Sequence, residues 1–234
     1  MRSTTPQAVR ERVIVFATFN EGKTREVQAL LEGLPVRLLG PREVGVQGLP
    51  EETGETFLDN ALLKAGAVFE RTGLWSLSDD SGLEVAALNG APGVHSARYG
   101  GVEHDDARNI ARLLRELRGV EDRRAWFTCH AVLVLEADRR LESLDLPGGV
   151  RLIRAHEWLP RRAAAVLAVG RVEGRIVDQP AGQNGFGYDP VFFRDDLGRT
   201  FAELTREQKN ALSHRGQALR ALREYLRWYL DERT

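Results

Sequence analysis

The sequence predicts an α/β fold with a mixed β-sheet, on three observations. Continuous apolar runs typical of buried strands occur at residues 13–17, 126–135 and 163–172. Amphipathic segments with helical spacing, such as residues 24–31, lie between and after these runs. Strands and helices therefore alternate along the chain with some antiparallel pieces, which is typical of an α/β domain.

The chain of 234 residues, 42% of them hydrophobic, can bury a full core as one large domain or as two lobes that share a cleft. Residues 1–11 lack periodicity, so we expect a flexible N-terminal arm before one folded unit over residues 12–234. The chain shows neither the apolar core of a signal peptide nor an apolar run near the ~20 residues of a membrane span. We expect a cytoplasmic protein without a membrane partner.

The charge balance argues against a nucleic-acid partner. Basic and acidic residues number 33 and 34, so no global positive field would attract DNA or RNA, and a polyanionic ligand has to be held locally. The single cysteine, Cys129, excludes an intramolecular disulfide and a cysteine-based zinc site. Because it lies in an apolar run, we interpret it as a buried strand thiol.

Three further helices are predicted. One covers residues 56–72 and stops at Gly73, and another covers residues 109–117. The last begins at Thr205 as N-cap, with Gln208 as its capping-box partner, and continues without a break. Its apolar stripe consists of Leu212, Leu219, Leu222, Leu226 and Leu230.

Two strand predictions concern where a strand ends or turns. Residues 75–77 form a short strand that delivers the following acidic residues into a loop, and the strand at residues 163–172 turns at Gly174. The segment 142–162 contains Arg and Pro and fits either an extended hairpin or a surface insertion.

The turn between the first strand and residues 24–31 is suited to phosphate. Thr18, Asn20 and Lys23 offer a hydroxyl, an amide and an ammonium group beside the free N–H groups of a helix start. A P-loop is disfavoured because Ala17 stands where that motif needs Gly. An ordinary turn with a surface lysine is an equally good interpretation of this motif alone.

The motif Ser78-Asp79-Asp80-Ser81-Gly82 predicts a magnesium site. Two adjacent carboxylates are costly in a confined site unless a divalent cation lies near them. In a strand, Asp79 and Asp80 would point to opposite faces, so that one meets the ligand and the other braces the site. Glu51 or Glu52 can add a carboxylate. The alternatives are an Asx turn that ends the strand and a solvated acidic turn.

Two later motifs complete the candidate site. The glycines around Phe186 let its ring stack on a flat base, which contributes about 1–3 kcal/mol, although a Gly-rich hairpin with core aromatics fits equally well. Pro190 excludes a dinucleotide fingerprint. His214 and Arg215 lie near Lys209 on the last helix, where surface ion pairs are the simpler interpretation of an isolated triplet.

The order and separation of these motifs resemble the Ham1-like family of pyrophosphatases acting on non-standard purine nucleoside triphosphates, also called inosine triphosphate pyrophosphatases. The resemblance runs from Val13 to about Leu222. Besides the motifs above, it includes the blocks Asn60-Ala61-Leu62-Leu63-Lys64-Ala65 and Gly90-Ala91-Pro92-Gly93-Val94-His95-Ser96-Ala97-Arg98-Tyr99. It implies an elongated, two-lobed fold with a central active-site cleft, a homodimer, and Mg²⁺-dependent cleavage of ITP, dITP or XTP into the monophosphate and pyrophosphate.

The resemblance also implies roles for individual residues. Asp80 would be the proton acceptor and a magnesium ligand together with Glu51. The substrate would be bound by Thr18, Asn20, Lys23, Ser81, Phe186, Gly187, Tyr188, Asp189, Lys209, His214 and Arg215. The supporting residues would be Asp79, Glu52, Asn60 and Lys64.

This sequence departs from the family pattern at two places. Phe19 is bulky where the family often has a small residue, and residues 142–168 form a longer segment than usual. Two other functions stay open: a Maf-like nucleotide pyrophosphatase of different base preference, and a nucleotide-binding module without turnover. The intact carboxylates and Lys23 argue against the second of these.

Overall fold

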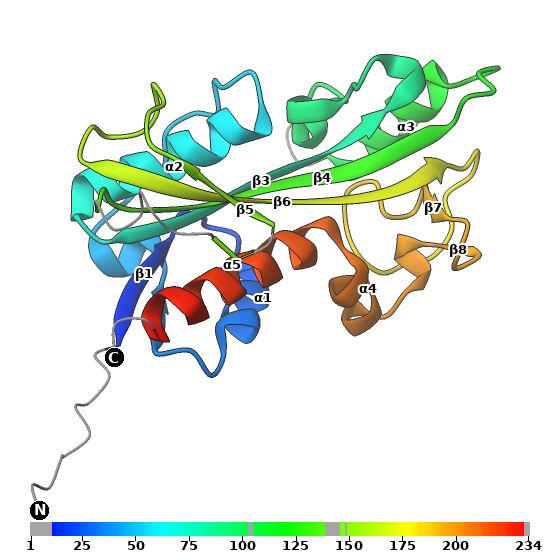
Figure 1. The fold of residues 1–234 in the computed structure, drawn as a ribbon. Helices are drawn as coiled ribbons and strands as arrows, with labels where there is room; N and C mark the ends of the chain where they lie inside the picture. The colour runs from blue at the N-terminus through cyan, green and yellow to red at the C-terminus, as the bar shows by residue number, and fades with distance from the viewer. Residues whose placement is uncertain (1–10, 103–104, 139–145, 148, 232–234) are drawn as a thin grey trace, which may run out of the picture.

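The computed structural model describes residues 11–102, 105–138, 146–147 and 149–231. Its strands are β1 (Arg12–Phe16), β2 (Val36–Leu39), β3 (Trp75–Val85), β4 (Arg124–Glu136), β5 (Val150–Ile153), β6 (Ala163–Ile176), β7 (Phe192–Arg194) and β8 (Arg199–Thr200). They form one sheet in the order β2-β1-β3-β4-β6-β7-β8, with β5 paired to β6 (Figure 1). Because β1 is parallel to β2 and β3 while the other pairs are antiparallel, the predicted mixed sheet is confirmed.

Helices cover both faces of this sheet. The α-helices are α1 (Glu21–Leu31), α2 (Phe57–Thr72), α3 (Asp106–Glu116), α4 (Arg206–Leu212) and α5 (His214–Asp231). Short 3₁₀ turns occur at η1 (Pro41–Val44), η2 (Ala86–Leu88), η3 (Gly93–Arg98) and η5 (Phe201–Glu203). The α5 helix packs with alternate β4 residues such as Leu133, whereas α2 packs with their neighbours such as Val132, so the two helices lie on opposite faces (Figure 1).

Local signals explain the helix ends. Thr56 caps α2 in a capping box with Asp59, and Gly73 ends the helix in the left-handed conformation, as predicted. The capping box of Thr205 and Gln208 is also confirmed. The prediction of one continuous last helix is wrong, because Ser213 is extended and separates α4 from α5. Its hydroxyl accepts a hydrogen bond from the Gly216 N–H, so it starts α5 like an N-cap serine.

Two strands are longer than predicted. The acidic pair lies inside β3 and not in a loop, because β3 pairs with β4 from Ser76 to Val85 without interruption. Likewise β6 continues through Gly174, where a side chain would collide with the backbone of Phe193. Within the unassigned segment 142–162, Val150–Ile153 pairs with β6 and favours the hairpin interpretation. Residues 139–145 and 148, like residues 1–10 of the predicted arm, lie outside the described residues.

The long strands connect two separate apolar cores. On β3, Leu77 belongs to the cluster covered by α5, and Leu83 belongs to a second cluster with Phe127 and Phe192. Polar residues occupy the stretch between these clusters, so the acidic pair lies at the junction of two packed regions. In the described part of the chain, no helix has both the length and the apolar composition of a membrane span.

Candidate active site

The first part of the site is the turn between β1 and α1. Asn20 is the N-cap of α1, where its side chain accepts the Lys23 N–H at 3.0 Å and its own N–H donates to the Thr18 hydroxyl at 3.1 Å. These bonds fix the turn, and the first turn of a helix leaves backbone N–H groups without intrahelical acceptors. The predicted strand-turn-helix unit is confirmed, with α1 starting three residues earlier than residue 24. The turn therefore has the donors of an anion site.

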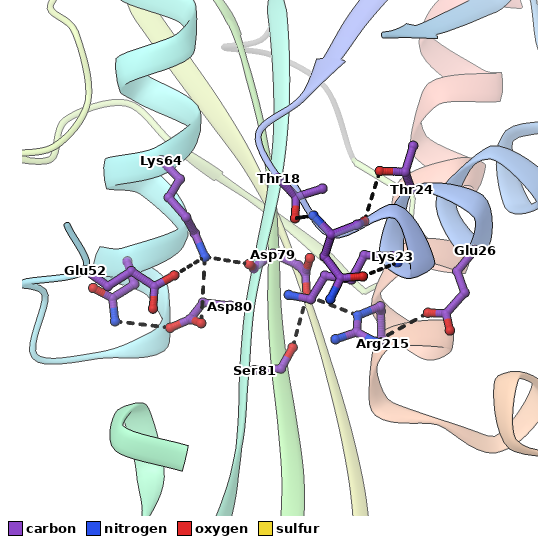
Figure 2. A network of polar contacts seen from close by, with 12 residues as sticks. Thr18, Lys23, Thr24, Glu26, Glu52, Lys64, Asp79, Asp80, Ser81 and Arg215 are labelled. Carbon is purple, nitrogen blue, oxygen red and sulfur yellow. Dashed lines mark hydrogen bonds and ion pairs between the residues drawn. The ribbon is translucent and has the colours of Figure 1, made fainter. Parts of the chain in front are cut away.

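Asp79 lies at the centre of a buried cluster of cations (Figure 2). Its Oδ2 accepts hydrogen bonds from Lys23 Nζ at 3.0 Å, Arg215 Nε at 3.1 Å and the Ser81 hydroxyl at 3.2 Å. Burial alone would raise the pKa of Asp79, but Lys23 and Arg215 outweigh it and hold the pKa well below its usual range. Asp79 is therefore a permanent anion that fixes two cations.

Asp80 points to the opposite face of β3 (Figure 2). It accepts the Asn60 side-chain amide at 3.1 Å, and Lys64 Nζ lies 3.8 Å from its other oxygen. Lys64 also donates to Glu52 at 2.5 Å and to the Asp79 carbonyl at 3.0 Å. Burial raises the pKa of Asp80 to about 6, with Glu52 adding to the rise and Lys64 opposing it. This carboxylate therefore ionises close to neutral pH.

The two acidic residues before α2 differ in position. Glu52 lines the same cleft as Asp80 and shares Lys64 with it. Glu51 is exposed and is not among the described residues that line the cleft. The structure thus brings to Asp80 the glutamate that we predicted as a supporting residue, and not the one predicted as a metal ligand. The sequence could not distinguish them, because adjacent residues in an irregular segment have no fixed direction.

Asp80 and Glu52 are chemically suited to Mg²⁺. Carboxylate oxygens are its preferred protein ligands, and one or two of them together with substrate phosphates make a typical site. Burial and the charge of Glu52 raise the pKa of Asp80 in spite of Lys64, so a cation at this pair would favour the ionised carboxylate. Among the described residues, no group of three or more His, Cys, Asp or Glu side chains could hold a metal alone. The donor set fits a cation that also needs the substrate.

An exposed aromatic ring marks the other end of the cleft. Phe186 is 57% exposed, and Lys209 Nζ lies 4.2 Å from the centre of its ring. Asp189 fixes both residues, because its carboxylate accepts the Phe186 N–H at 2.9 Å and forms an ion pair with Lys209. Asp106, which we did not predict, accepts the Gly187 N–H at 2.6 Å. An exposed ring on a fixed loop favours stacking over the core-aromatic interpretation.

Two further predicted residues of the cleft, Tyr188 and His214, are buried. Tyr188 is buried and donates its hydroxyl to the Ser96 carbonyl at 3.0 Å, so it supports the loop with an internal bond. His214 is buried and stacks on Phe127 with ring centres 4.9 Å apart. Burial and the neighbouring Arg215 lower the pKa of His214 well below its usual range, which keeps the imidazole neutral.

Arg215 is more constrained than the sequence indicated. Its guanidinium donates to Asp79 at 3.1 Å and to Glu26 at 3.3 Å. Glu26 was not predicted, although it lies three residues after Lys23 and therefore on a neighbouring part of the same helix surface. The surface-pair interpretation of Arg215 is wrong, since both partners and Arg215 itself are largely buried.

These groups surround one cleft of about 560 Å³, which is large enough for a nucleotide. Its lining brings together most of the predicted residues, namely Thr18, Asn20, Lys23, Glu52, Lys64, Asp80, Ser81, Phe186, Gly187, Tyr188, Asp189, Lys209, His214 and Arg215. Asp79 in β3 and Asn60 in α2 do not line the cleft, but they form hydrogen bonds with Lys23 and Asp80, which do. The arrangement places a phosphate turn, a carboxylate pair and an aromatic ring around a shared space.

Comparison with known proteins agrees with this arrangement. The sequence model of the Ham1 family matches residues 14–225. The chain belongs to the Ham1 family. It is 44% identical over 214 residues to the dITP/XTP pyrophosphatase of Pectobacterium atrosepticum, covering 92% of this chain and 98% of that protein. It is 46% identical over 211 residues to the dITP/XTP pyrophosphatase of Halorhodospira halophila, covering 89% and 94%.

Solved structures show the same fold. The Staphylococcus aureus Ham1 protein superposes with a TM-score of 0.77 at 35% identity, covering 93% of this chain and 100% of that one. A nucleoside-triphosphatase / dITP/XTP pyrophosphatase from Mycobacterium abscessus gives a TM-score of 0.69 at 41% identity, covering 90% and 98%. The predicted elongated α/β fold of the Ham1 type is confirmed, and the family match favours this class over the Maf-like alternative.

Proposed function

We propose that this protein is a house-cleaning pyrophosphatase that hydrolyses ITP, dITP and XTP to the monophosphate and pyrophosphate. The observation that carries the proposal is the convergence of the β1–α1 turn, the Asp80–Glu52 carboxylate pair and the exposed Phe186 ring on one cleft. Family relatives named dITP/XTP pyrophosphatases support the substrate class. A sensor without turnover would not need a buried carboxylate whose pKa lies near neutrality.

The phosphate chain is bound by the turn and by Lys23. Thr18, Asn20 and the first N–H groups of α1 offer hydrogen bonds to phosphate oxygens, and Lys23 is held in place by Asp79. A donor that is already fixed loses little entropy when the transition state forms, so its interaction with developing charge is strong. These residues position the bond between the α- and β-phosphates.

Asp80 is the proposed proton acceptor. In the metal-free protein burial raises the pKa of Asp80 to about 6, and a cation beside it would lower this pKa, so the carboxylate is ionised at neutral pH and can accept a proton. Asn60 and Lys64 orient the carboxylate toward the water that attacks phosphorus. Asp80 and Glu52 would hold Mg²⁺, which when bound neutralises phosphate charge and acidifies water. Asp79 accepts hydrogen bonds from Lys23 and Ser81, and these bonds hold the Lys23 ammonium group in place.

Base selection takes place around Phe186. Its ring stacks on the purine, while Lys209 and Arg215 bring cationic donors to within 4.2 and 5.9 Å of the ring centre. Inosine and xanthine carry an acceptor oxygen at the 6-position, where adenine carries an amino donor. Adenine would therefore place an amino donor against these cationic donors, which disfavours ATP. His214, Asp189 and Tyr188 shape the pocket behind the base.

The test is product release by the purified protein with Mg²⁺. We expect pyrophosphate and monophosphate from ITP, dITP and XTP, little turnover of ATP, GTP and dTTP, and loss of activity with EDTA. Release of orthophosphate would place the cleaved bond elsewhere, and preference for dTTP would support a Maf-like activity. Absence of turnover with every nucleotide would leave a binding module. A cytoplasmic homodimer is part of the proposal on family resemblance alone.

A further inference from the structure

The cations that line the cleft are all compensated by protein carboxylates in the described structure. Lys23 pairs with Asp79, Lys64 with Glu52, and Lys209 with Asp189. Arg215 pairs with both Asp79 and Glu26. A nucleoside triphosphate carries several negative charges, with more on its terminal phosphate than on either of the others, so the lining offers little surplus positive charge for that group. A further cation at the phosphate end would have a clear electrostatic role.

Arg42 is a cation that does not itself line the cleft but contacts a residue that does. It lies in η1, and its guanidinium carbon is 5.2 Å from the ring centre of Phe19, a cleft residue that is 42% exposed. Among the described residues, Arg42 has no carboxylate partner. The adjacent Glu43 directs its carboxylate to the Gly40 N–H, which it accepts at 2.6 Å, and not to Arg42. Arg42 is therefore an exposed charge without a direct carboxylate partner in the described structure.

The sheet order places Arg42 at the phosphate end. Phe186 follows β6, Asp80 lies in the central β3, and Phe19 follows β1, so these residues succeed one another along the order β6-β4-β3-β1-β2. Arg42 follows β2, which is parallel to β1, and the carboxyl ends of parallel neighbours lie at one edge. A nucleotide with its base on Phe186 and its scissile bond near Asp80 would extend its terminal phosphate toward Phe19 and Arg42.

Backbone and packing contacts fix η1, so the main chain of Arg42 has a defined position. Pro41 is buried, the Gly45 N–H donates to the Arg42 carbonyl, and Val46 packs in the apolar cluster next to β1. The phenyl ring of Phe19 in turn limits the positions of the guanidinium, since a cation is attracted to the face of an aromatic ring. Phe19, the bulky residue in the phosphate turn, therefore positions the charge of Arg42.

We propose that Arg42, stacked on Phe19, is a binding subsite for the terminal phosphate of the substrate and for the pyrophosphate product. This rests on the proposed cleavage between the α- and β-phosphates. Arg42 would distinguish triphosphates from diphosphates, because only the former reach it. It is a binding residue and has no part in proton transfer.

The experiment compares Arg42→Gln with Arg37→Gln. Arg37 is also exposed and loses the same charge, but it lines a groove outside the cleft. We expect Arg42→Gln to raise KM for dITP about fivefold with kcat nearly unchanged, to leave KM for dIDP unchanged, and to match Arg37→Gln in stability. Arg42→Lys should restore part of the affinity, because it keeps the charge but lacks the planar stacking group.

Calorimetric titration with Mg²⁺ and inorganic pyrophosphate provides a readout that needs no turnover. The dissociation constant should rise about fivefold in Arg42→Gln and stay at the wild-type value in Arg37→Gln. Equal pyrophosphate affinity in both variants, or an equal effect on dITP and dIDP, would overturn the subsite. If the wild-type protein cleaves no triphosphate, the proposed function fails, while the pyrophosphate titration still decides whether Arg42 binds this anion.

Discussion

Asp79 and Asp80 are consecutive residues of one strand, yet their pKa values move in opposite directions. Asp79 faces the side of β3 that carries Lys23 and Arg215, and both donate to its carboxylate. Asp80 faces the side that carries Asn60, Lys64 and Glu52, where one cation is shared between two carboxylates. Both carboxylates are buried, so the difference comes from their partners.

The comparison shows how one strand separates two tasks. Alternation sends neighbouring side chains to opposite faces, and each face brings its own helices. Asp79 is compensated within the protein and serves to hold cations in place. Asp80 is undercompensated, which leaves it able to bind a cation or accept a proton. The predictions below test this division of roles, from the largest expected effect to the smallest.

Replacing Asp80 by Asn should remove catalysis and spare the fold. We expect kcat to fall by about 10³-fold or more, because the proton acceptor and a metal ligand are both lost. Unfolding free energy should change by no more than about 1 kcal/mol, since Lys64 keeps Glu52 as a partner. Steady-state kinetics and urea denaturation measure the two quantities.

The matched surface control is Asp195→Asn, which removes an exposed carboxylate that pairs with Arg175. It should leave both quantities at their wild-type values. Substantial residual turnover in the Asp80 variant would contradict its role as the proton acceptor.

Replacing Asp79 by Asn should primarily destabilise the protein. Lys23 and Arg215 would lose the carboxylate between them, and breaking a buried charge cluster costs about 3–5 kcal/mol. Turnover should fall as well, because Lys23 loses its orienting partner. Chemical denaturation of Asp79→Asn and Asp80→Asn measures the difference in their unfolding free energies. Equal stability of the two variants would contradict the structural role of Asp79.

Replacing Phe186 by Ala should weaken substrate binding without affecting stability. Loss of base stacking removes about 1–3 kcal/mol of binding free energy, so KM for dITP should rise roughly 5- to 150-fold while kcat changes little. The ring is 57% exposed, so unfolding free energy should stay close to that of the wild type. An unchanged KM would mean that the purine stacks elsewhere.

His214 should make stability dependent on pH. Its folded pKa is depressed, so the neutral ring stabilises the fold fully above about pH 6.5, and this contribution is lost as the pH falls below that value. The slope from this residue is at most about 1.4 kcal/mol per pH unit. His214→Phe keeps a ring against Phe127 and removes the titration. Its urea stability between pH 4.5 and 6.5 should vary less than that of the wild type.

The sequence predicted much of this fold because several signals are local. Apolar runs identified β1, β4 and β6, Gly73 marked the end of α2, and the capping residue Thr205 marked the start of α4. The break at Ser213 escaped prediction because Leu212 before it and Leu219 after it have a spacing that fits the apolar stripe of a single helix. The continuation of β3 through its acidic pair was missed because the polar side chains are satisfied by Lys23, Arg215 and other distant residues.

The sequence predicted which residues form the site better than it predicted how they are arranged. The motifs named most of the polar residues in the cleft but not Glu26 or Asp106, and the choice of Glu52 over Glu51 depends on the direction of a segment without regular structure. The pairing of Arg215 with Glu26 depends on the tertiary position of α1 beside α5. Residue types and spacing do not contain this information, whereas packing of the sheet and helices does.

The division between Asp79 and Asp80 is tested most directly by Mg²⁺ binding in the absence of turnover. Metal-free wild-type protein, Asp80→Asn, Glu52→Gln and Glu51→Gln would be titrated with Mg²⁺ in the presence of inorganic pyrophosphate, which supplies phosphate oxygens to the cation, and unfolded by heat, since a ligand of the native state raises Tm. We predict that Mg²⁺ stabilises the wild type and Glu51→Gln, but has little effect on Asp80→Asn and Glu52→Gln. Equal stabilisation of all four proteins would contradict the assignment of the cation to the Asp80 face of β3.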